Sequence, residues 1–369
     1  MKNKFNLFGF ISLAVIISLL TIGCPEEEKE KPTISSVTIS PATAYLINGK
    51  TQTFTAKVDG HDSLAKTVTW SIVETGKNSG TTINSSGLLT VAATETLTSF
   101  TVKATSTADT AKSSTATVNI MPTTALNPSD SSVQTYTNNG SVSLPSSPYH
   151  YEMWTAGGSG NKLLWYGPNQ GGGAAFRAEW NNPNDFLGRI GYYWGSGKPY
   201  TNYKNMYADF AYTRSGTNTA GNYSYIGIYG WGRNPSASKN EEKLIEYYIV
   251  EDWFGNQWQG DSSPMGTSTT GGSLVGSYIL DDAKYNVVKN VRQNQSSIDG
   301  TKTFTQFFSI RQTLRKSGTI SITEHFKKWE ALNMNLGNMY ECKFLVEAGG
   351  GTGWLELSYL KFLQEDSPR

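Results

Sequence analysis

A carboxylate inside an apolar run is the first feature of this sequence that could do chemistry. Residues 244–251 read Leu-Ile-Glu-Tyr-Tyr-Ile-Val-Glu, and their β-branched and aromatic side chains predict a strand. Because side chains of a strand point alternately to opposite faces, Tyr247 and both isoleucines share one face, and Glu246 and Tyr248 share the other. Burial among such neighbours raises the pKa of a carboxyl. We therefore interpret Glu246 as a working carboxylate that needs a partner.

A second carboxyl of this kind ends another predicted strand. Cys342, Phe344 and Val346 are expected to face the core, so Glu347 points the other way. Two carboxyls that flank a glycosidic bond can hydrolyse it, one by donating a proton and the other by attacking the sugar or activating water. Glu347 is therefore the best candidate for the partner of Glu246.

Aromatic and polar side chains on other predicted strands could line a groove for a sugar chain. Alternation over 225–231 places two tyrosines and Trp231 on one face, and alternation over 304–310 places Gln306 beside two phenylalanines. Sugars stack their C–H faces on aromatic rings and bond to polar side chains. The pattern predicts two packed sheets, one of which presents an aromatic face to a cleft.

The composition fits an all-β protein and argues against several other functions. The 369 residues include 37 Gly, 20 Tyr and 10 Trp, and 37% are hydrophobic. Thirty-one Lys and Arg nearly balance thirty Asp and Glu, so no nucleic-acid partner is expected. Three scattered histidines, two cysteines and the absence of a phosphate-binding loop lead us to expect no metal and no cofactor. We expect a monomer.

The N-terminus predicts export and a lipid anchor. Residues 1–23 have the basic start and apolar run of a signal peptide. The following Thr21-Ile-Gly-Cys24 resembles a bacterial lipoprotein cleavage box, which implies that Cys24 carries the lipid. A plain secretory peptide with an incidental cysteine is the alternative. The predicted location is the bacterial cell envelope, lipid-anchored and facing outward, or the secreted fraction, and Cys342 is expected to be a buried thiol.

The first half of the chain is predicted to hold a spacer and a small domain. Residues 24–33 form a charged, solvated spacer. Residues 34–121 contain short alternating strands around one central Trp70, which predicts a small β-sandwich. The expected strands cover 37–39, 53–58, 68–73, 100–104 and 116–120. The motifs Val37-Thr-Ile-Ser-Pro41, Val68-Thr-Trp70 and Gly87-Leu-Leu-Thr-Val91 resemble the bacterial Ig-like group 2 domain, which implies a spacer or adhesion module.

The second half is predicted to be one larger β domain. Residues 122–147 are rich in Pro, Ser, Thr and Asn and are expected to form a linker, with a strand near Val142. Residues 148–365 are rich in aromatics and are expected to form two packed sheets with one helix. The helix is expected to begin at Thr323 as N-cap, and Phe326, Trp329 and Leu332 repeat at helical spacing on its buried face.

Several stretches of this domain, in this order, resemble glycoside hydrolase family 11. They are Tyr151-Glu-Met-Trp154, Tyr229-Gly-Trp-Gly-Arg-Asn-Pro235, 244–251, Ser297-Ile-Asp-Gly300, 303–312, 325–329 and Asn333-Met-Asn-Leu-Gly337. The resemblance covers about residues 149–360. It implies an all-β jelly roll and an endo-1,4-β-xylanase that hydrolyses xylan with retention of anomeric configuration.

The resemblance also implies roles for individual residues. Glu246 matches the nucleophile, Glu347 the general acid/base, and Asp185 a neighbour of the acid/base that modulates it. Substrate-binding roles follow for Trp154, Tyr229, Trp231, Tyr248, Arg292, Ser297, Ile298 and Gln306, with Ser297 and Ile298 at the tip of a loop called the thumb. Because an aspartate at 185 can share the proton of the acid/base, we expect an acidic optimum that Asp185→Asn moves toward neutral.

The match has departures that keep two alternatives open. Ser296 stands where the thumb usually has Pro, Phe308 replaces a common Trp, and Ala348-Gly349 replaces the Gly-Tyr that usually follows the acid/base. Residues 236–243 are expected to form an exposed insertion. The alternatives are a non-catalytic, glycan-binding surface lipoprotein and the same mechanism acting on a β-glucan.

Overall fold

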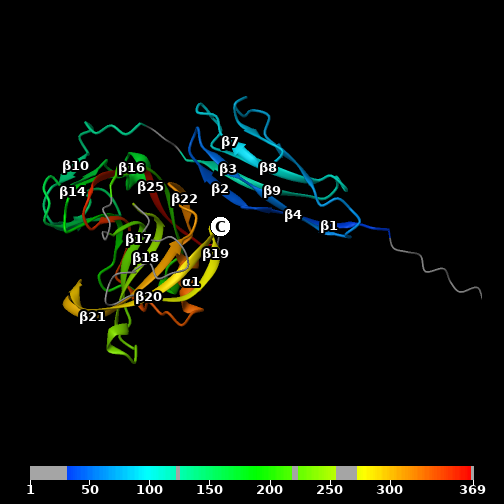
Figure 1. Ribbon diagram of the computed structural model, residues 1–369. Coiled ribbons are helices and arrows are strands. Elements are labelled where there is room, and N and C mark those ends of the chain that lie inside the picture. The colour runs from blue at the N-terminus through cyan, green and yellow to red at the C-terminus, as the bar shows by residue number, and fades with distance from the viewer. Residues whose placement is uncertain (1–30, 122–124, 218–222, 255–271, 367–369) are drawn as a thin grey trace, which may run out of the picture.

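The computed structural model describes residues 31–121, 125–217, 223–254 and 272–366 (Figure 1). The predicted signal peptide and Cys24 lie outside these residues. The described part is built almost entirely from strands, with one α-helix, α1 (Ile322–Glu330), and three 3₁₀ turns. These turns are η1 (Gly171–Gly173), η2 (Tyr200–Asn202) and η3 (Asn240–Glu242). The predicted all-β fold class is confirmed.

Two large sheets form the C-terminal part of the molecule. The ten-stranded sheet has the order β11 (Gly140–Ser143), β12 (His150–Ala156), β15 (Asp185–Tyr193), β24 (Glu341–Ala348), β17 (Ser224–Arg233), β18 (Leu244–Asp252), β21 (Gly300–Arg311), β20 (Ala283–Ser297) and β19 (Ser273–Leu280), with β23 (Asn338–Met339) beside β17. The six-stranded sheet has the order β10 (Gln134–Tyr136), β13 (Lys162–Trp165), β14 (Phe176–Asn181), β25 (Thr352–Glu365), β16 (Asn205–Gly216) and β22 (Ser317–Ile320). Strand β11 is the strand expected near Val142, whereas β10 lies in the stretch expected as a linker, so the six-stranded sheet begins earlier in the chain than predicted.

The alternation read from the sequence describes the two faces of the ten-stranded sheet. Ile245, Tyr247 and Ile249 of β18 belong to the main core, which also takes side chains from the six-stranded sheet. Tyr248 belongs to a second apolar cluster on the opposite face, made by β17, β18, β20, β21 and β24. The side chains of β17 are divided between the two faces in the same way, and its tyrosines and Trp231 belong to the second cluster. The second face, called the cleft face below, is therefore the predicted aromatic face.

The helix buries two of the three predicted residues and starts two residues earlier than expected. Ser321, not Thr323, is the N-cap residue, and its side chain makes no capping hydrogen bond. The Thr323 hydroxyl instead accepts a hydrogen bond of 2.8 Å from the backbone N–H of Met206 and so attaches the helix to β16. Phe326 and Trp329 are buried in the main core, as predicted, whereas Leu332 lies beyond the end of the helix and packs against that core.

Three smaller sheets around a separate core form the N-terminal part. They contain β1 (Ile34–Ser40) with β4 (Thr55–Gly60); β2 (Thr43–Leu46), β9 (Ser113–Ile120), β8 (Ser99–Ser106) and β5 (Val68–Ile72); and β3 (Thr51–Thr53), β7 (Leu88–Thr90) and β6 (Thr82–Ile83). The single strand predicted over 53–58 is divided at the buried Phe54. Strand β3 pairs with β7 and β4 pairs with β1, so the chain changes sheets at this residue. Alternation could not reveal this change because both segments keep the same period.

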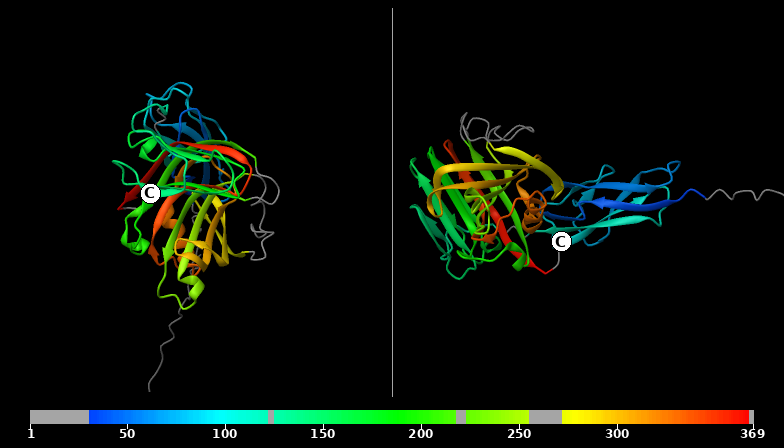
Figure 2. Two further views of the ribbon diagram at one scale, coloured as in Figure 1. Left: turned by 90° about the vertical axis from the view of Figure 1, so that its left-hand side faces the viewer. Right: turned by 90° about the horizontal axis from the view of Figure 1, so that it is seen from below.

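The N-terminal part extends to one side of the two large sheets (Figure 2). A small apolar cluster joins the two parts, with Met121, Ala211 and Tyr359 buried and Tyr45 and Ile47 packed against them. In addition, the Ser40 hydroxyl lies 3.4 Å from Asp282 of the turn between β19 and β20. No helix in the described ranges is long and apolar enough to cross a membrane.

Candidate active site

The two predicted carboxyls meet on the cleft face. Glu246 of β18 and Glu347 of β24 are 7% and 6% exposed, although each is a charged residue type. The hydroxyl of Tyr248 lies 3.2 Å from Glu246 Oε1 and 3.2 Å from Glu347 Oε2. These two carboxylate oxygens are therefore at most about 6.4 Å apart. This arrangement accommodates the separation of about 5–5.5 Å that is typical of a retaining carboxyl pair.

Glu246 is fixed by donors from two neighbouring strands. Tyr229 of β17 donates to its Oε1 at 2.7 Å, and Gln306 of β21 donates to its Oε2 at 2.6 Å. The Trp231 indole N–H lies 2.5 Å from the Tyr229 hydroxyl, which accepts this bond while it donates to Glu246. Burial raises the pKa of Glu246, whereas the bonds from Tyr229 and Gln306 oppose the rise because they stabilise the ionised form.

Glu347 lies in a site that favours its protonated form. Burial, together with the nearby carboxyls of Asp185 and Glu246, raises the pKa of Glu347 well above its usual range. Asp185 begins β15, next to the end of β24, where Leu187 pairs with Glu347. Burial also raises the pKa of Asp185, to about 6, and a hydrogen bond with Tyr223 opposes this shift. The site therefore pairs one carboxyl held by hydrogen-bond donors with another whose protonated form is favoured by its surroundings.

The remaining predicted residues lie around this pair. Trp154 of β12 is 39% exposed and pairs with Leu187, which places it two strands, or about 10 Å, from Glu347. Arg292 of β20 is close enough to favour the ionised form of Asp185. The rings of Tyr248 and Phe308 stack at 4.7 Å, so the phenylalanine at the expected Trp position supports the bridging tyrosine.

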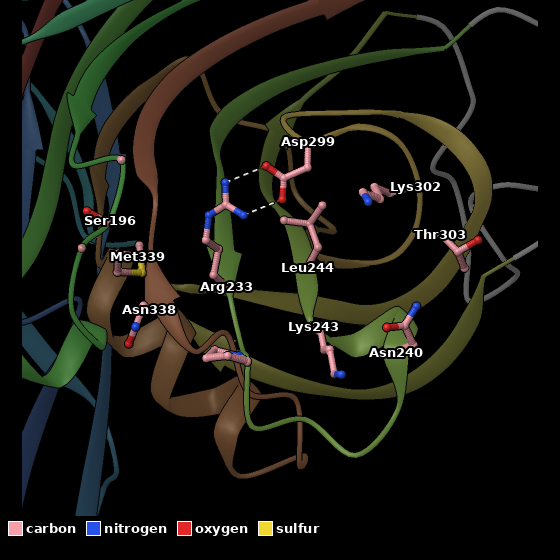
Figure 3. Close-up of a pocket in the computed structure, with 13 residues that line it drawn as sticks. Ser196, Arg233, Asn240, Lys243, Leu244, Asp299, Lys302, Thr303, Asn338 and Met339 are labelled. Atoms are coloured by element: carbon pink, nitrogen blue, oxygen red, sulfur yellow. Dashed lines mark hydrogen bonds and ion pairs between the residues drawn. The ribbon is translucent and has the colours of Figure 1, made fainter.

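The predicted thumb is the long hairpin of β20 and β21. At its tip, the Ser297 hydroxyl bonds to the Gly300 carbonyl at 2.6 Å, and Ile298 packs against the apolar cluster of the cleft face. Asp299 forms two hydrogen bonds, of 2.5 and 2.8 Å, with Arg233 at the end of β17 (Figure 3). The tip is therefore attached to the strand that carries Tyr229.

A pocket of about 600 Å³ opens beside this ion pair. Its lining comes from the thumb, the ends of β17, β18 and β23, residues 195–197 and the insertion before β18 (Figure 3). Along β17, Tyr225 pairs with Glu347 and Trp231 pairs with Glu246, and Arg233 follows two residues later. The pocket therefore continues the cleft face beyond Glu246, on the side away from Glu347. The insertion is largely exposed, as expected, and includes η3.

Sequence reasoning missed several residues that fix this geometry. Asn290 of β20 donates at 2.8 Å to the amide oxygen of Gln306, which leaves the Gln306 amide nitrogen to donate to Glu246. The Tyr223 ring occupies the space that a side chain at Gly349 would need, next to Asp185. Alternation could have placed Asn290 beside Arg292 on one face of its strand, but the sequence gives no signal that Tyr223 lies against Gly349.

A network of four charged side chains was also missed. It lies on the cleft face of β12, β15 and β24 and consists of Glu152, Arg189, Glu341 and Lys343. Alternation along β24 places Glu341 and Lys343 on the same face as Glu347. That signal was available, although the ion pairs depend on strands far apart in sequence.

The comparisons with known proteins agree with this geometry. Residues 146–358 match the sequence profile of the family described as glycosyl hydrolases family 11. Endo-1,4-beta-xylanase C of Fibrobacter succinogenes is 40% identical over 233 residues, which cover 63% of this chain and 34% of that protein. Endo-1,4-beta-xylanase A of Bacillus pumilus is 37% identical over 207 residues, or 56% of this chain and 78% of that protein. The chain thus spans about a third of the first relative and most of the second.

A solved structure gives the same result. The crystal structure of wild-type ENZbleach xylanase superposes with a TM-score of 0.59 and 62% sequence identity, covering 63% of this chain and 87% of that chain. The predicted jelly roll is confirmed by this likeness and by the two packed sheets. The profile match covers more than half of the 369 residues and includes both buried carboxyls. The chain therefore belongs to family 11 of the glycosyl hydrolases.

Proposed function

We propose that this protein is an endo-1,4-β-xylanase that cleaves internal bonds of xylan with retention of anomeric configuration. The observation that carries the proposal is the pair of buried carboxyls, Glu246 and Glu347, that share the hydroxyl of Tyr248. Relatives named endo-1,4-beta-xylanase support the choice of substrate.

The proposed reaction has two steps. Glu347 donates its proton to the leaving oxygen while the ionised Glu246 attacks the anomeric carbon, so the glycosidic bond breaks as a covalent xylosyl–enzyme ester forms. Glu347, now ionised, then takes a proton from a water molecule. The resulting hydroxide attacks the anomeric carbon, releases Glu246 and leaves Glu347 protonated for the next cycle. Two inversions at one carbon give net retention.

Residues around the pair are proposed to hold the chain. Trp154 supplies an exposed ring on which a xylosyl unit can stack, Ile298 of the thumb tip packs against the cleft face, and Arg292 lies near Asp185. The pocket beside Arg233 is proposed to take a further xylosyl unit of the chain, because it continues the cleft face beyond the nucleophile.

The N-terminal part is proposed to carry the enzyme on the cell envelope. Residues 1–23 would direct export, and lipid on Cys24 would anchor the chain facing outward. A bacterial Ig-like group 2 domain over 34–121 would then act as spacer or adhesion module. Release as a secreted protein is the other outcome, and we propose a monomer in both cases.

Reducing-end release by the full chain tests the proposal. Wild type would be compared on xylan, mixed-linkage glucan and carboxymethyl cellulose, with Glu246→Gln as the inactive variant and Glu356→Gln, in the other sheet, as the control. Turnover of xylan that only Glu246→Gln abolishes is the expected result. Turnover of a glucan alone would overturn the substrate, and xylan binding without turnover would indicate a capture protein.

A further inference from the structure

The charged network of Glu152, Arg189, Glu341 and Lys343 lies on the cleft face and contacts the ring of Tyr229, which bonds to Glu246. Arg189 is 3% exposed, Glu341 1% and Lys343 0%. Arg189 lies 2.7 Å from Glu152 and 3.5 Å from Glu341, and Lys343 bonds to the same two carboxylates at 3.2 and 2.7 Å. Glu152 is 24% exposed, so three of the four charges are buried, and burying them is costly unless each is paired.

The network holds the Arg189 guanidinium against a single aromatic ring. The guanidinium carbon lies 4.2 Å from the centroid of Tyr229, well within the range of a cation–π contact. Although burial disfavours its charge, Glu341, Tyr229 and Glu152 raise the pKa of Arg189 well above its usual range. Arg189 is therefore a permanent positive charge on the face of the ring whose hydroxyl bonds to Glu246 at 2.7 Å.

We propose that Arg189 is a positioning residue that acts through Tyr229. Its charge on the ring makes the phenol a stronger hydrogen-bond donor, and the stronger bond stabilises the ionised form of Glu246. Glu152 and Glu341 hold the guanidinium in place. Lys343 contacts both carboxylates, so that two positive charges balance two negative ones. This inference rests on the proposed role of Glu246 as nucleophile and adds a residue outside direct contact with the sugar or with Glu246.

Several other groups also face Glu246 and set the background for this effect. They are Asp185 of β15, Tyr225 of β17, Tyr248 of β18 and Glu347 of β24; Arg292 of β20 lies near Asp185 and Tyr225, and Glu341 of β24 lies near Tyr229. Burial raises the pKa of Glu246, and Arg189 is the cation that opposes this rise. Loss of the cation should therefore move the ionisation of Glu246 to higher pH.

The test is the pH dependence of kcat/KM on xylan for the full chain. Arg189→Met should shift the acidic, rising limb upward by about one pH unit. Arg189→Lys, which keeps the charge but loses the flat guanidinium, should restore part of the shift. Arg177→Met is the matched control, because Arg177 also pairs with two glutamates and lies 4.5 Å from the centroid of Trp354, in the other sheet. It should leave the rising limb unchanged.

A double-mutant cycle shows whether the effect passes through Tyr229. In a Tyr229→Phe background, which keeps the ring but loses the hydroxyl, Arg189→Met should shift the limb much less than in wild type. An equal shift in both backgrounds, or no shift in Arg189→Met, would overturn the proposal. If Arg189→Met fails to fold, the pair Arg189→Met with Glu152→Gln removes one charge of each sign and must give the same upward shift. A wild-type chain inactive on xylan would instead overturn the proposed function itself.

Discussion

Glu246 and Glu347 each lie 3.2 Å from the same phenolic oxygen, that of Tyr248. A phenol has one proton to donate, so it can bond to both carboxyls only when one of them is itself a donor. The arrangement fits an ionised Glu246 that accepts from Tyr248 and a protonated Glu347 that donates to it. These are the protonation states that the first step of a retaining hydrolase needs.

Removing the Tyr248 hydroxyl should take one hydrogen bond from Glu246 and one from Glu347. We expect Tyr248→Phe to lower kcat/KM about 10- to 100-fold, because a hydrogen bond to a charged group contributes about 1.5–3 kcal/mol. Tyr200→Phe is a matched control, since Tyr200 bonds to Glu330 at 2.5 Å outside the cleft. Steady-state kinetics on xylan would measure the difference. Equal losses in the two variants would show that the shared hydroxyl has no special role.

The short separation of the carboxyls predicts the stereochemistry of the product. Two carboxyls that share one hydroxyl, with their bonded oxygens at most about 6.4 Å apart, fit direct attack by Glu246 on the sugar, as in a retaining hydrolase. The first product seen by proton NMR during hydrolysis of a xylo-oligosaccharide should be the β-anomer. Initial formation of the α-anomer would rule out Glu246 as a nucleophile.

Asp185 should set the alkaline side of the pH profile. Above its pKa of about 6, the aspartate becomes charged and raises the pKa of Glu347 further, which makes Glu347 a poorer proton donor. Activity should therefore fall as pH rises through about 6. In Asp185→Asn no such ionisation occurs, so the falling limb should move to higher pH. Measured pH profiles with an identical falling limb would contradict this role.

The ion pair between Arg233 and Asp299 should hold the thumb tip near β17. Both bonds are short, but both side chains are about one-third exposed, so the pair contributes little to stability. We expect Arg233→Ala to raise KM for xylan a few-fold with little change in the free energy of unfolding. The exchanged pair, Arg233→Asp with Asp299→Arg, should restore part of the affinity. Failure of the exchange to improve on either single variant would mean that the ion pair does not control the thumb.

Much of the site could be predicted because strands impose a strict period of two. That period alone predicts that Glu246 and Glu347 lie on the face opposite the main core, and the observed clusters divide their neighbours in the same way. Gln306 is expected beside the phenylalanines of its strand for the same reason, and it lies there.

The contacts across strands could not be predicted in this way. The Arg189 network joins residues up to 191 positions apart, from Glu152 to Lys343, and depends on a register that local patterns do not specify. The predicted start of the helix was wrong because Thr323 has a tertiary partner, Met206, that competes with capping. The change of sheet at Phe54 depends likewise on pairing partners rather than on local preference.

The most direct test of the account is trapping of the covalent intermediate on Glu246. A 2-deoxy-2-fluoro-xylobioside with a good leaving group would be incubated with the full chain, and the labelled peptide would be sequenced by mass spectrometry. We expect one xylobiosyl adduct, on Glu246, formed more slowly in Tyr248→Phe and absent in Glu246→Gln. An adduct on another residue, or none from a chain that hydrolyses xylan, would contradict it.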